Sequence, residues 1–200
     1  MPSYHAIHEA VEFTTGLAKN FELGLYLFTN VTPGHGFQVI GTHIRPRVSA
    51  PESWSIPVGL SLSGEIGYQK STYSEDTWNV EVRLIIDKQW DKFYATFNPT
   101  LGIALKGISG MHTPVFEPNV KISYQFFEKA SLGLEYYGGM GYITHPDPLK
   151  DQSHALYAAY DLVGNAAWEL NIGAGIGLTQ VTEGLVGKVL VGRRINWAKK

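Results

Sequence analysis

Three short motifs of this chain have residue types that could take part in chemistry. His5 and His8 in "HAIH" could bind a metal, but residues three apart on a strand point to opposite faces. Ser153 and His154 are adjacent, so on a strand they too lie on opposite faces and cannot act as a nucleophile and its base. The run "GAGIG" at 173–177 lacks the spacing and the following helix of a dinucleotide-binding motif. We therefore expect no metal site, no cofactor and no enzymatic activity.

Charged residues on the polar side of alternating segments are more informative. Those that we assign to an inward face are Glu12, Glu22, Arg45 and Arg47, together with the solute-path candidates Glu65, Glu81, Arg83, Asp87, Lys121, Glu135, Asp161, Glu169, Lys188 and Arg194. Charges of both signs have two interpretations, which the sequence leaves open. They can pair across an interior and fill it, or they can line a water-filled path, because ionisable groups in membrane-spanning segments normally face a polar interior.

The elements that position these charges are strands, because apolar and polar residues alternate over most of the chain. In "WELNIGAGIGLT", at 168–179, every second residue is apolar and the positions between are mostly glycine. This period of two fits strands and no helix. Eleven segments follow it: 5–15, 20–30, 37–48, 54–69, 77–88, 92–105, 117–127, 130–139, 153–162, 166–178 and 185–197. Short connections between consecutive segments predict an antiparallel meander.

The connections and the tryptophans suggest where such a sheet would lie. Short and long connections alternate, so one end of the meander has tight turns and the other has long loops, as in bacterial outer-membrane barrels. Most segments have the 9–11 residues or more that a tilted strand needs to cross a bilayer. We expect the tryptophans to mark the membrane interfaces, four of them at the short-turn end and Trp78 at the other. They are Trp54, Trp78, Trp90, Trp168 and Trp197.

Composition excludes several other classes of protein. The chain has 200 residues, no cysteine and a formal net charge of −2, which argues against disulfides, thiolate metal sites and nucleic-acid binding. No run of about 18 apolar residues could form a transmembrane helix. Only 17% of residues are charged, and the polar side of the strands is rich in Gly, Ser, Thr and Asn. A soluble barrel or sandwich would be expected to show more charge on a water-facing side.

The fold predicted for residues 1–200 is a single all-β domain, an antiparallel up-and-down transmembrane β-barrel. Bacterial single-chain barrels have even numbers of strands and both termini on the periplasmic side. Eleven segments, with the first leading down into a short turn, therefore predict an N-terminally truncated twelve-strand barrel. The beginning "MPSYHAIHEA" has no signal-peptide pattern, so we expect the signal peptide and the first strand to be missing from this chain.

Several long stretches stand out as a set: "GTHIRPRVSAPESWSIPVGLSLSGEIGYQ", "DTWNVEVRLIIDKQW", "FEPNVKISYQF", "WELNIGAGIGLT" and "VGKVLVGRRINW". They resemble a family of uncharacterised bacterial outer-membrane β-barrels, and the resemblance covers nearly the whole chain. The family is similar to a group of outer-membrane transporters named for phenol degradation. The resemblance implies a twelve-strand barrel and supplies no catalytic residues. The residues "AKK" after Trp197 depart from the family's aromatic-ended last strand.

Three functions are compatible with these patterns. The first is a passive outer-membrane channel or transporter for small solutes, with the bilayer as its partner and no cofactor. The second is a structural or surface-interaction barrel with a plugged lumen, whose long loops near 106–116 and 139–153 contact a partner. The third is a soluble barrel that binds an apolar ligand inside. The sequence favours the first and does not fix the solute or the oligomeric state.

Overall fold

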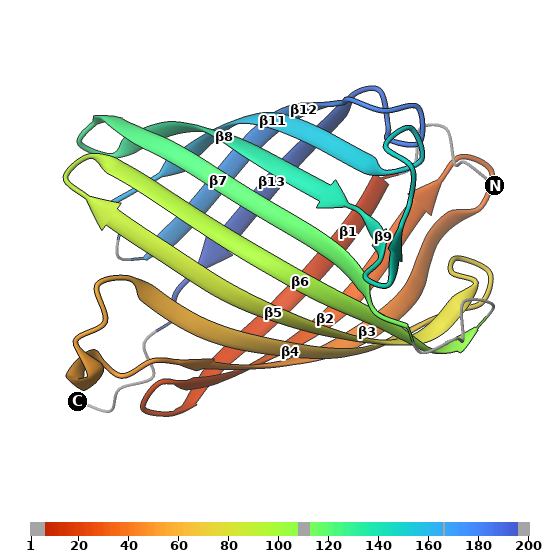
Figure 1. Cartoon of the computed structure of the whole chain (residues 1–200), viewed down its shortest axis with the longest axis horizontal. Coiled ribbons are helices and arrows are strands. Elements are labelled where there is room, and N and C mark those ends of the chain that lie inside the picture. Colours follow the sequence, from red (N-terminus) through yellow and green to blue (C-terminus); the bar gives the residue numbers. More distant parts are fainter. Residues whose placement is uncertain (1–6, 108–112, 166, 196–200) are drawn as a thin grey trace. The chain divides into compact units, whose positions relative to one another are not determined.

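The computed structural model describes residues 7–107, 113–165 and 167–195, and these form an antiparallel all-β structure (Figure 1). Its elements are β1 (Ile7–Ala18), β2 (Phe21–Thr32), β3 (Gly36–Ser49), the 3-10 turn η1 (Glu52–Trp54), β4 (Gly59–Gln69), β5 (Asp76–Trp90), β6 (Phe93–Gly107), β7 (Val115–Phe127), β8 (Ala130–Gly139), β9 (Gly141–Tyr142), β10 (His145–Pro146), β11 (Ser153–Leu162), β12 (Trp168–Gly177) and β13 (Val186–Arg193). None of the helices described here is long and apolar enough to cross a membrane.

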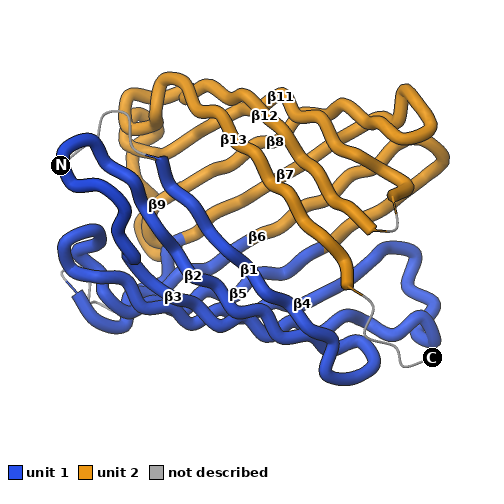
Figure 2. The backbone as a smooth tube through the Cα atoms, turned by 180° about the vertical axis from the view of Figure 1, so that it is seen from behind, with its two compact units in different colours: residues 1–85, 100–115 blue, residues 86–99, 116–200 orange. Residues whose placement is uncertain are grey.

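The chain divides into two compact units, each of which is described by itself (Figure 2). Unit 1 comprises residues 1–85 and 100–115, and unit 2 comprises residues 86–99 and 116–200. In unit 1, β1, β2, β3, β4 and the first part of β5 are neighbours in chain order. In unit 2, β7, β8, β11, β12 and β13 follow one another in the same way. Strands β5 and β6 contribute residues to both units.

Strand register separates an apolar and a polar face in unit 1. Directly opposed residues lie on the same face of a sheet. Phe13 faces Leu25, which in turn faces Ile44 and then Ile66, and all of these large side chains are exposed. The adjacent positions carry the polar face, where Glu12 faces Tyr26 and Tyr26 faces His43. The predicted alternation is therefore present in the paired strands.

Unit 2 shows the same separation of faces. Ile122 faces Leu134 on the apolar face, and Leu134 faces Ala158, which faces Ala174. On the polar face, Lys121 is directly opposite Glu135. The remaining pairs on that face join Glu135 to Tyr157, Tyr157 to Gly175, Asp161 to Asn171, and Gly173 to Lys188.

Burial in this protein is the reverse of that in a water-soluble protein. The buried hydrophobic side chains are those of Ile40, Ala155 and Ala159, and Pro118 is also buried. The buried polar or charged residues are Thr29, Asn30, His43, Ser63, Thr100, Ser123, Ser131 and Glu135. Soluble domains bury mainly large aliphatic and aromatic side chains, whereas here most of these side chains are exposed. Each unit has its polar groups inside and its apolar groups outside.

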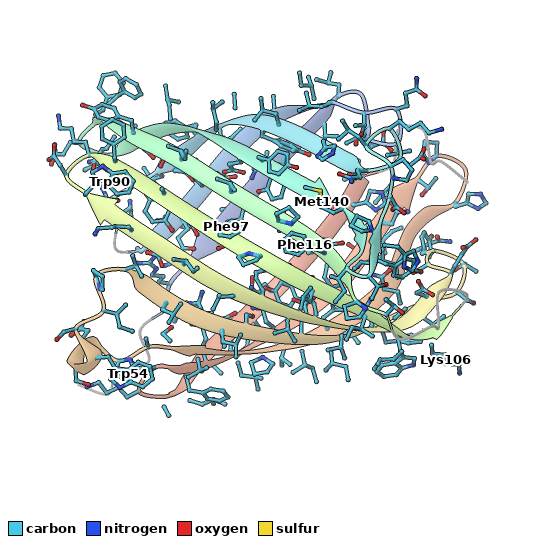
Figure 3. All side chains as sticks on the ribbon, viewed as in Figure 1. Trp54, Trp90, Phe97, Lys106, Phe116 and Met140 are labelled. Carbon is cyan, nitrogen blue, oxygen red and sulfur yellow. The ribbon has the colours of Figure 1, made fainter. Side chains whose placement is uncertain are left out.

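Aromatic side chains gather near strand ends. In unit 2, Trp90 lies at the end of β5 (Figure 3). Trp168 begins β12, and the antiparallel strand order puts it at the same end of that unit. Trp90 stacks on Phe93, with ring centroids 6.1 Å apart. In unit 1, Trp54 lies in η1 at one end, and Trp78 lies at the other end beside Tyr68. Trp197 lies outside the described residues.

Each of the eleven predicted segments overlaps one long strand, with three differences. The described residues form thirteen strands rather than eleven, because the predicted loop at 139–153 contains the two-residue strands β9 and β10. The segment predicted at 54–69 begins only at Gly59, because Pro57 cannot donate to a strand ladder and Ser55 ends η1 with a left-handed φ of 52°. Strand β1 extends to Ala18, into the predicted turn at 16–20, with a register shift between Gly16 and Ala18.

Candidate functional site

The polar face of unit 2 carries an ion-pair network centred on Glu135, which is 3% exposed. Lys121 Nζ lies 3.0 Å from Glu135 Oε1 and 2.6 Å from Asp161 Oδ1. Lys188 pairs with Glu135 from the other side and donates to the Tyr137 hydroxyl at 3.0 Å. Tyr137 in turn donates to Glu135 Oε2 at 2.8 Å. We call Lys121, Glu135, Tyr137, Asp161 and Lys188 the Glu135 network.

Asn171 joins the two acids of this network. Its side-chain nitrogen donates to Glu135 Oε1 at 3.0 Å and to Asp161 Oδ1 at 2.8 Å. The acids come from β8 and β11, whereas Asn171 lies on β12. These side-chain hydrogen bonds therefore link β8, β11 and β12, in addition to the backbone hydrogen bonds of the sheet. Charge-assisted hydrogen bonds of this kind are roughly twice as strong as neutral ones.

The glycines of β12 explain how side chains on distant strands can meet. A Cβ added to Gly173 would lie 3.0 Å from Cε of Lys188, and one added to Gly175 would strike the Tyr157 ring. Lys188 and Tyr157 therefore lie over backbone that has no side chain. Because of this space, Lys188 on β13 reaches across β12 and β11 to Glu135 on β8. The inward glycines leave room for neighbouring side chains.

A second ion pair on this face is more exposed. Arg194 Nε donates to Glu169 Oε1 at 2.8 Å, and the two side chains are 63% and 49% exposed. Arg193, the adjacent residue, has its guanidinium carbon 5.2 Å from the centre of the Trp168 ring, and Trp168 and Arg193 are paired across β12 and β13. The side chains of the adjacent residues Arg193 and Arg194 thus lie on opposite faces of the sheet.

A cavity of about 340 Å³ lies in unit 2, beside the exposed ion pair. Residues of the Glu135 network, Lys121 and Asp161, line one part of it, and Glu169 and Arg194 line another. The uncharged polar residues of its lining are Gln89, Tyr94, Ser123, Gln125, Ser131 and Asn171. The cavity therefore combines two ion pairs with a series of hydroxyl and amide groups.

Unit 1 has separate ion pairs on its own polar face. Its ion pairs are Glu12 with Arg45, Glu22 with Arg47, and Glu81 with Arg83, and His43 is hydrogen-bonded to Glu65. The guanidinium carbon of Arg45 also lies 5.0 Å from the centre of the Tyr26 ring. The His43 ring occupies the space above Gly67, where an added Cβ would meet it. This face repeats the arrangement of unit 2, with long side chains lying over glycine.

The structure brings most of the predicted solute-path residues into pairs. In unit 2, Lys121, Glu135, Asp161 and Lys188 belong to one network, while Glu169 and Arg194 form a pair. In unit 1, Glu65 is hydrogen-bonded to His43, and Glu81 pairs with Arg83. Among the described residues no ion pair includes Asp87.

Sequence reasoning missed His43, Tyr137 and Tyr157 as parts of these clusters. All three share the polar side of their strands with charged residues, so the period of two was the available signal. The prediction named only charged residues, whereas neutral rings can also accept or donate hydrogen bonds and lie beside cations. Lys188, for example, lies 5.2 and 5.5 Å from the ring centres of Tyr137 and Tyr157.

Two histidine-containing motifs, at 5–8 and 153–154, could suggest a metal site or a catalytic pair. No group of three or more His, Asp or Glu side chains in the described part of the chain could hold a metal ion. His5 of the "HAIH" motif lies outside the described residues. His154 Nδ1 is 2.7 Å from the Tyr136 hydroxyl, and the His154 backbone N–H donates to Thr182 Oγ1 at 3.0 Å.

No protein-family model matches the chain, and no curated protein matches it.

Proposed function

We propose that this chain is a transmembrane β-barrel protein of the bacterial outer membrane, and that its polar face bounds a path by which small solutes cross passively. The observation that carries the proposal is the inverted burial. Exposed side chains on the apolar face include Leu25, Ile44 and Ile66 in unit 1, and Ile122 and Leu134 in unit 2. Such continuous apolar surface is unfavourable in water and favourable against lipid.

Strand length and aromatic position support the same proposal. Strands β1 to β7 have 11 to 15 residues, and β8, β11 and β12 have 10. A tilted strand needs about 9–11 residues to span a bilayer. Trp90 and Trp168 share one strand end in unit 2, as expected of aromatic residues at a membrane–water interface. The bilayer is therefore the proposed partner of the apolar faces.

The charges on the polar faces support a path for small solutes rather than a path that selects ions of one sign. Positive and negative side chains alternate within each cluster, and the cavity in unit 2 is lined by both. Ionisable groups in membrane-spanning strands normally border an aqueous interior. Movement would follow the solute's own gradient, so the proposal requires no cofactor.

A structural barrel with a filled lumen is the second candidate. It is favoured by the same ion pairs, since groups that pair with each other can fill an interior instead of lining a path. The Glu135 network has this character, because its central acid is almost wholly buried. Conductance separates the two candidates.

The experiment is planar-bilayer recording on the full chain, refolded from detergent. Arg194→Gln and Arg193→Gln remove the same charge from adjacent positions on opposite faces. We expect conductance steps, with a reversal potential that Arg194→Gln shifts toward cation selectivity and Arg193→Gln leaves unchanged. Absence of channels, or equal shifts in both variants, contradicts the proposed path. Purification of the folded chain as a monomer without detergent contradicts the membrane assignment itself.

A further inference from the structure

The cavity on the polar face of unit 2 is lined by charged, uncharged polar and apolar residues. It lies next to the connections that join β7 to β8 and β11 to β12, since its lining includes Ser131, Leu162 and Val163. We propose that this cavity is a binding subsite for a small neutral polyhydroxylated solute, of the size of a monosaccharide or cyclic polyol. The inference rests on the proposed function, because it names the class of solute that the path would favour.

The first argument is an acceptor without a partner. Asp161 Oδ1 accepts from Lys121 Nζ at 2.6 Å and from Asn171 Nδ2 at 2.8 Å. Asp161 Oδ2 is buried and accepts no hydrogen bond within the described part of the chain. A buried carboxylate oxygen in that state costs free energy, which a donor from a bound molecule would recover once rotation of the carboxylate group exposes this oxygen to the cavity. The hydroxyl group of a solute is such a donor.

The second argument is the mixture of donors and acceptors in the lining. Ser123 and Ser131, both almost wholly buried, contribute hydroxyl groups, and Gln125 contributes an amide. A serine hydroxyl can donate one hydrogen bond and accept two, and an amide side chain can do both. Solute hydroxyls have the same dual capacity. A polyol can therefore form hydrogen bonds with this lining in more than one orientation. Such binding suits a solute that must dissociate again and continue along the path.

The third argument is charge. The cavity is lined by Lys92, Lys121 and Arg194 and by Asp161 and Glu169. Two ion pairs, Lys121–Asp161 and Glu169–Arg194, already use four of these five groups. A charged solute would have to compete with an existing pair, whereas a neutral one would not. Among these five groups, only Lys92 has no ion-pair partner within the described residues. We therefore expect an anionic solute to bind at Lys92.

The fourth argument is the apolar part of the lining. Tyr94 and Leu190 add an aromatic ring and an aliphatic side chain to the polar groups. Binding sites for small molecules typically combine apolar surface with a few convergent polar groups. In a cyclic polyol the C–H groups of the ring provide the matching apolar surface.

The test measures binding of myo-inositol and D-glucose to the refolded full chain in detergent by equilibrium dialysis, with D-gluconate and glycine as charged comparisons. Asp161→Asn should weaken myo-inositol binding about tenfold, because it removes a charged acceptor, and Ser131→Ala about threefold. Ser63→Ala is the matched control, since it removes an equally buried serine hydroxyl of unit 1 that does not line the cavity. Lys92→Gln should leave myo-inositol binding unchanged. Far-UV circular dichroism establishes that each variant is folded.

Lack of saturable binding of both polyols to the folded chain overturns the inference. Equal weakening by Ser131→Ala and Ser63→Ala overturns it too, and so does a preference for gluconate that Lys92→Gln abolishes or a preference for glycine. Conductance without polyol binding removes this subsite and leaves the proposed path standing. Polyol binding that depends on Asp161, in a protein without conductance, supports the subsite and removes the path.

Discussion

Removal of Glu135 should destabilise the folded protein more than removal of any exposed acid of the polar face. Glu135 accepts from Lys121, Lys188, Tyr137 and Asn171. In Glu135→Ala two ammonium groups lose their shared counter-charge, and Lys121 keeps only Asp161 as an ion-pair partner. Breaking a buried ion pair by removing one partner typically costs about 3–5 kcal/mol. Because the two lysines retain partial exposure, we expect the lower end of that range, about 3 kcal/mol.

The matched control is Glu169→Ala, which removes the same type of side chain from a half-exposed pair with Arg194. Exposed pairs contribute about 0–1 kcal/mol, so this variant should unfold almost as the parent does. The assay is equilibrium unfolding in guanidinium chloride, with the protein in lipid vesicles and tryptophan fluorescence as the signal. If Glu135→Ala and Glu169→Ala lose the same free energy of unfolding, the reasoning from burial is refuted.

A further variant separates the lost pairs from the lost shape. Replacing Glu135, Tyr137 and Lys188 together, as Glu135→Leu, Tyr137→Phe and Lys188→Met, leaves Lys121 paired with Asp161 and no unpaired charge at the centre of the network. Apolar replacement of whole buried ion pairs is often neutral or stabilising. The triple variant should therefore unfold at a higher denaturant concentration than Glu135→Ala alone. A triple variant less stable than the single one would show that the pairing itself contributes net stability.

The remaining predictions concern the two faces. Gly175→Ala should lower the free energy of unfolding by about 1–3 kcal/mol because the new methyl group strikes the Tyr157 ring. Gly187→Ala, where an added Cβ meets nothing within 4 Å, should change it by less than about 0.5 kcal/mol. Leu134→Arg, at a position 57% exposed on the apolar face, should cost about 2–4 kcal/mol in vesicles. Leu149→Arg, 71% exposed in the β8–β11 connection, should be nearly neutral, and equal effects of the two arginines would argue against a lipid-facing Leu134.

The strands were predictable from the sequence because side-chain alternation is a direct consequence of strand geometry. The segment predicted at 166–178, for example, coincides closely with β12, although its polar side is mostly glycine. The start of β4 was not predictable in the same way. Ile56 and Val58 continue the alternation past Pro57, but proline has no N–H to donate and the chain turns through η1 instead. Pattern identifies a strand, and backbone chemistry decides where it begins.

The candidate site was predictable in its membership but not in its pairing. Lys121, Glu135 and Lys188 could be assigned to one face by counting positions. That Glu135 pairs with both lysines could not be predicted, because β8 and β13 are separated by two other strands. The contact depends on register and on the absence of a side chain at Gly173, which are properties of three strands together. Sequence periodicity describes each strand only by itself.

The reach of Lys188 across two strands also has a consequence for assembly. A slip of β13 by one residue against β12 would turn the Lys188 ammonium onto the apolar face and bring Val189 to the polar one. Glu135 would then lose one of its two cations. Incorrect registers of the β12–β13 hairpin therefore leave a charge without a partner, whereas the correct register does not. The contact between Lys188 and Glu135, a residue of the β7–β8 hairpin, therefore favours the correct register of β13 over one shifted by one residue.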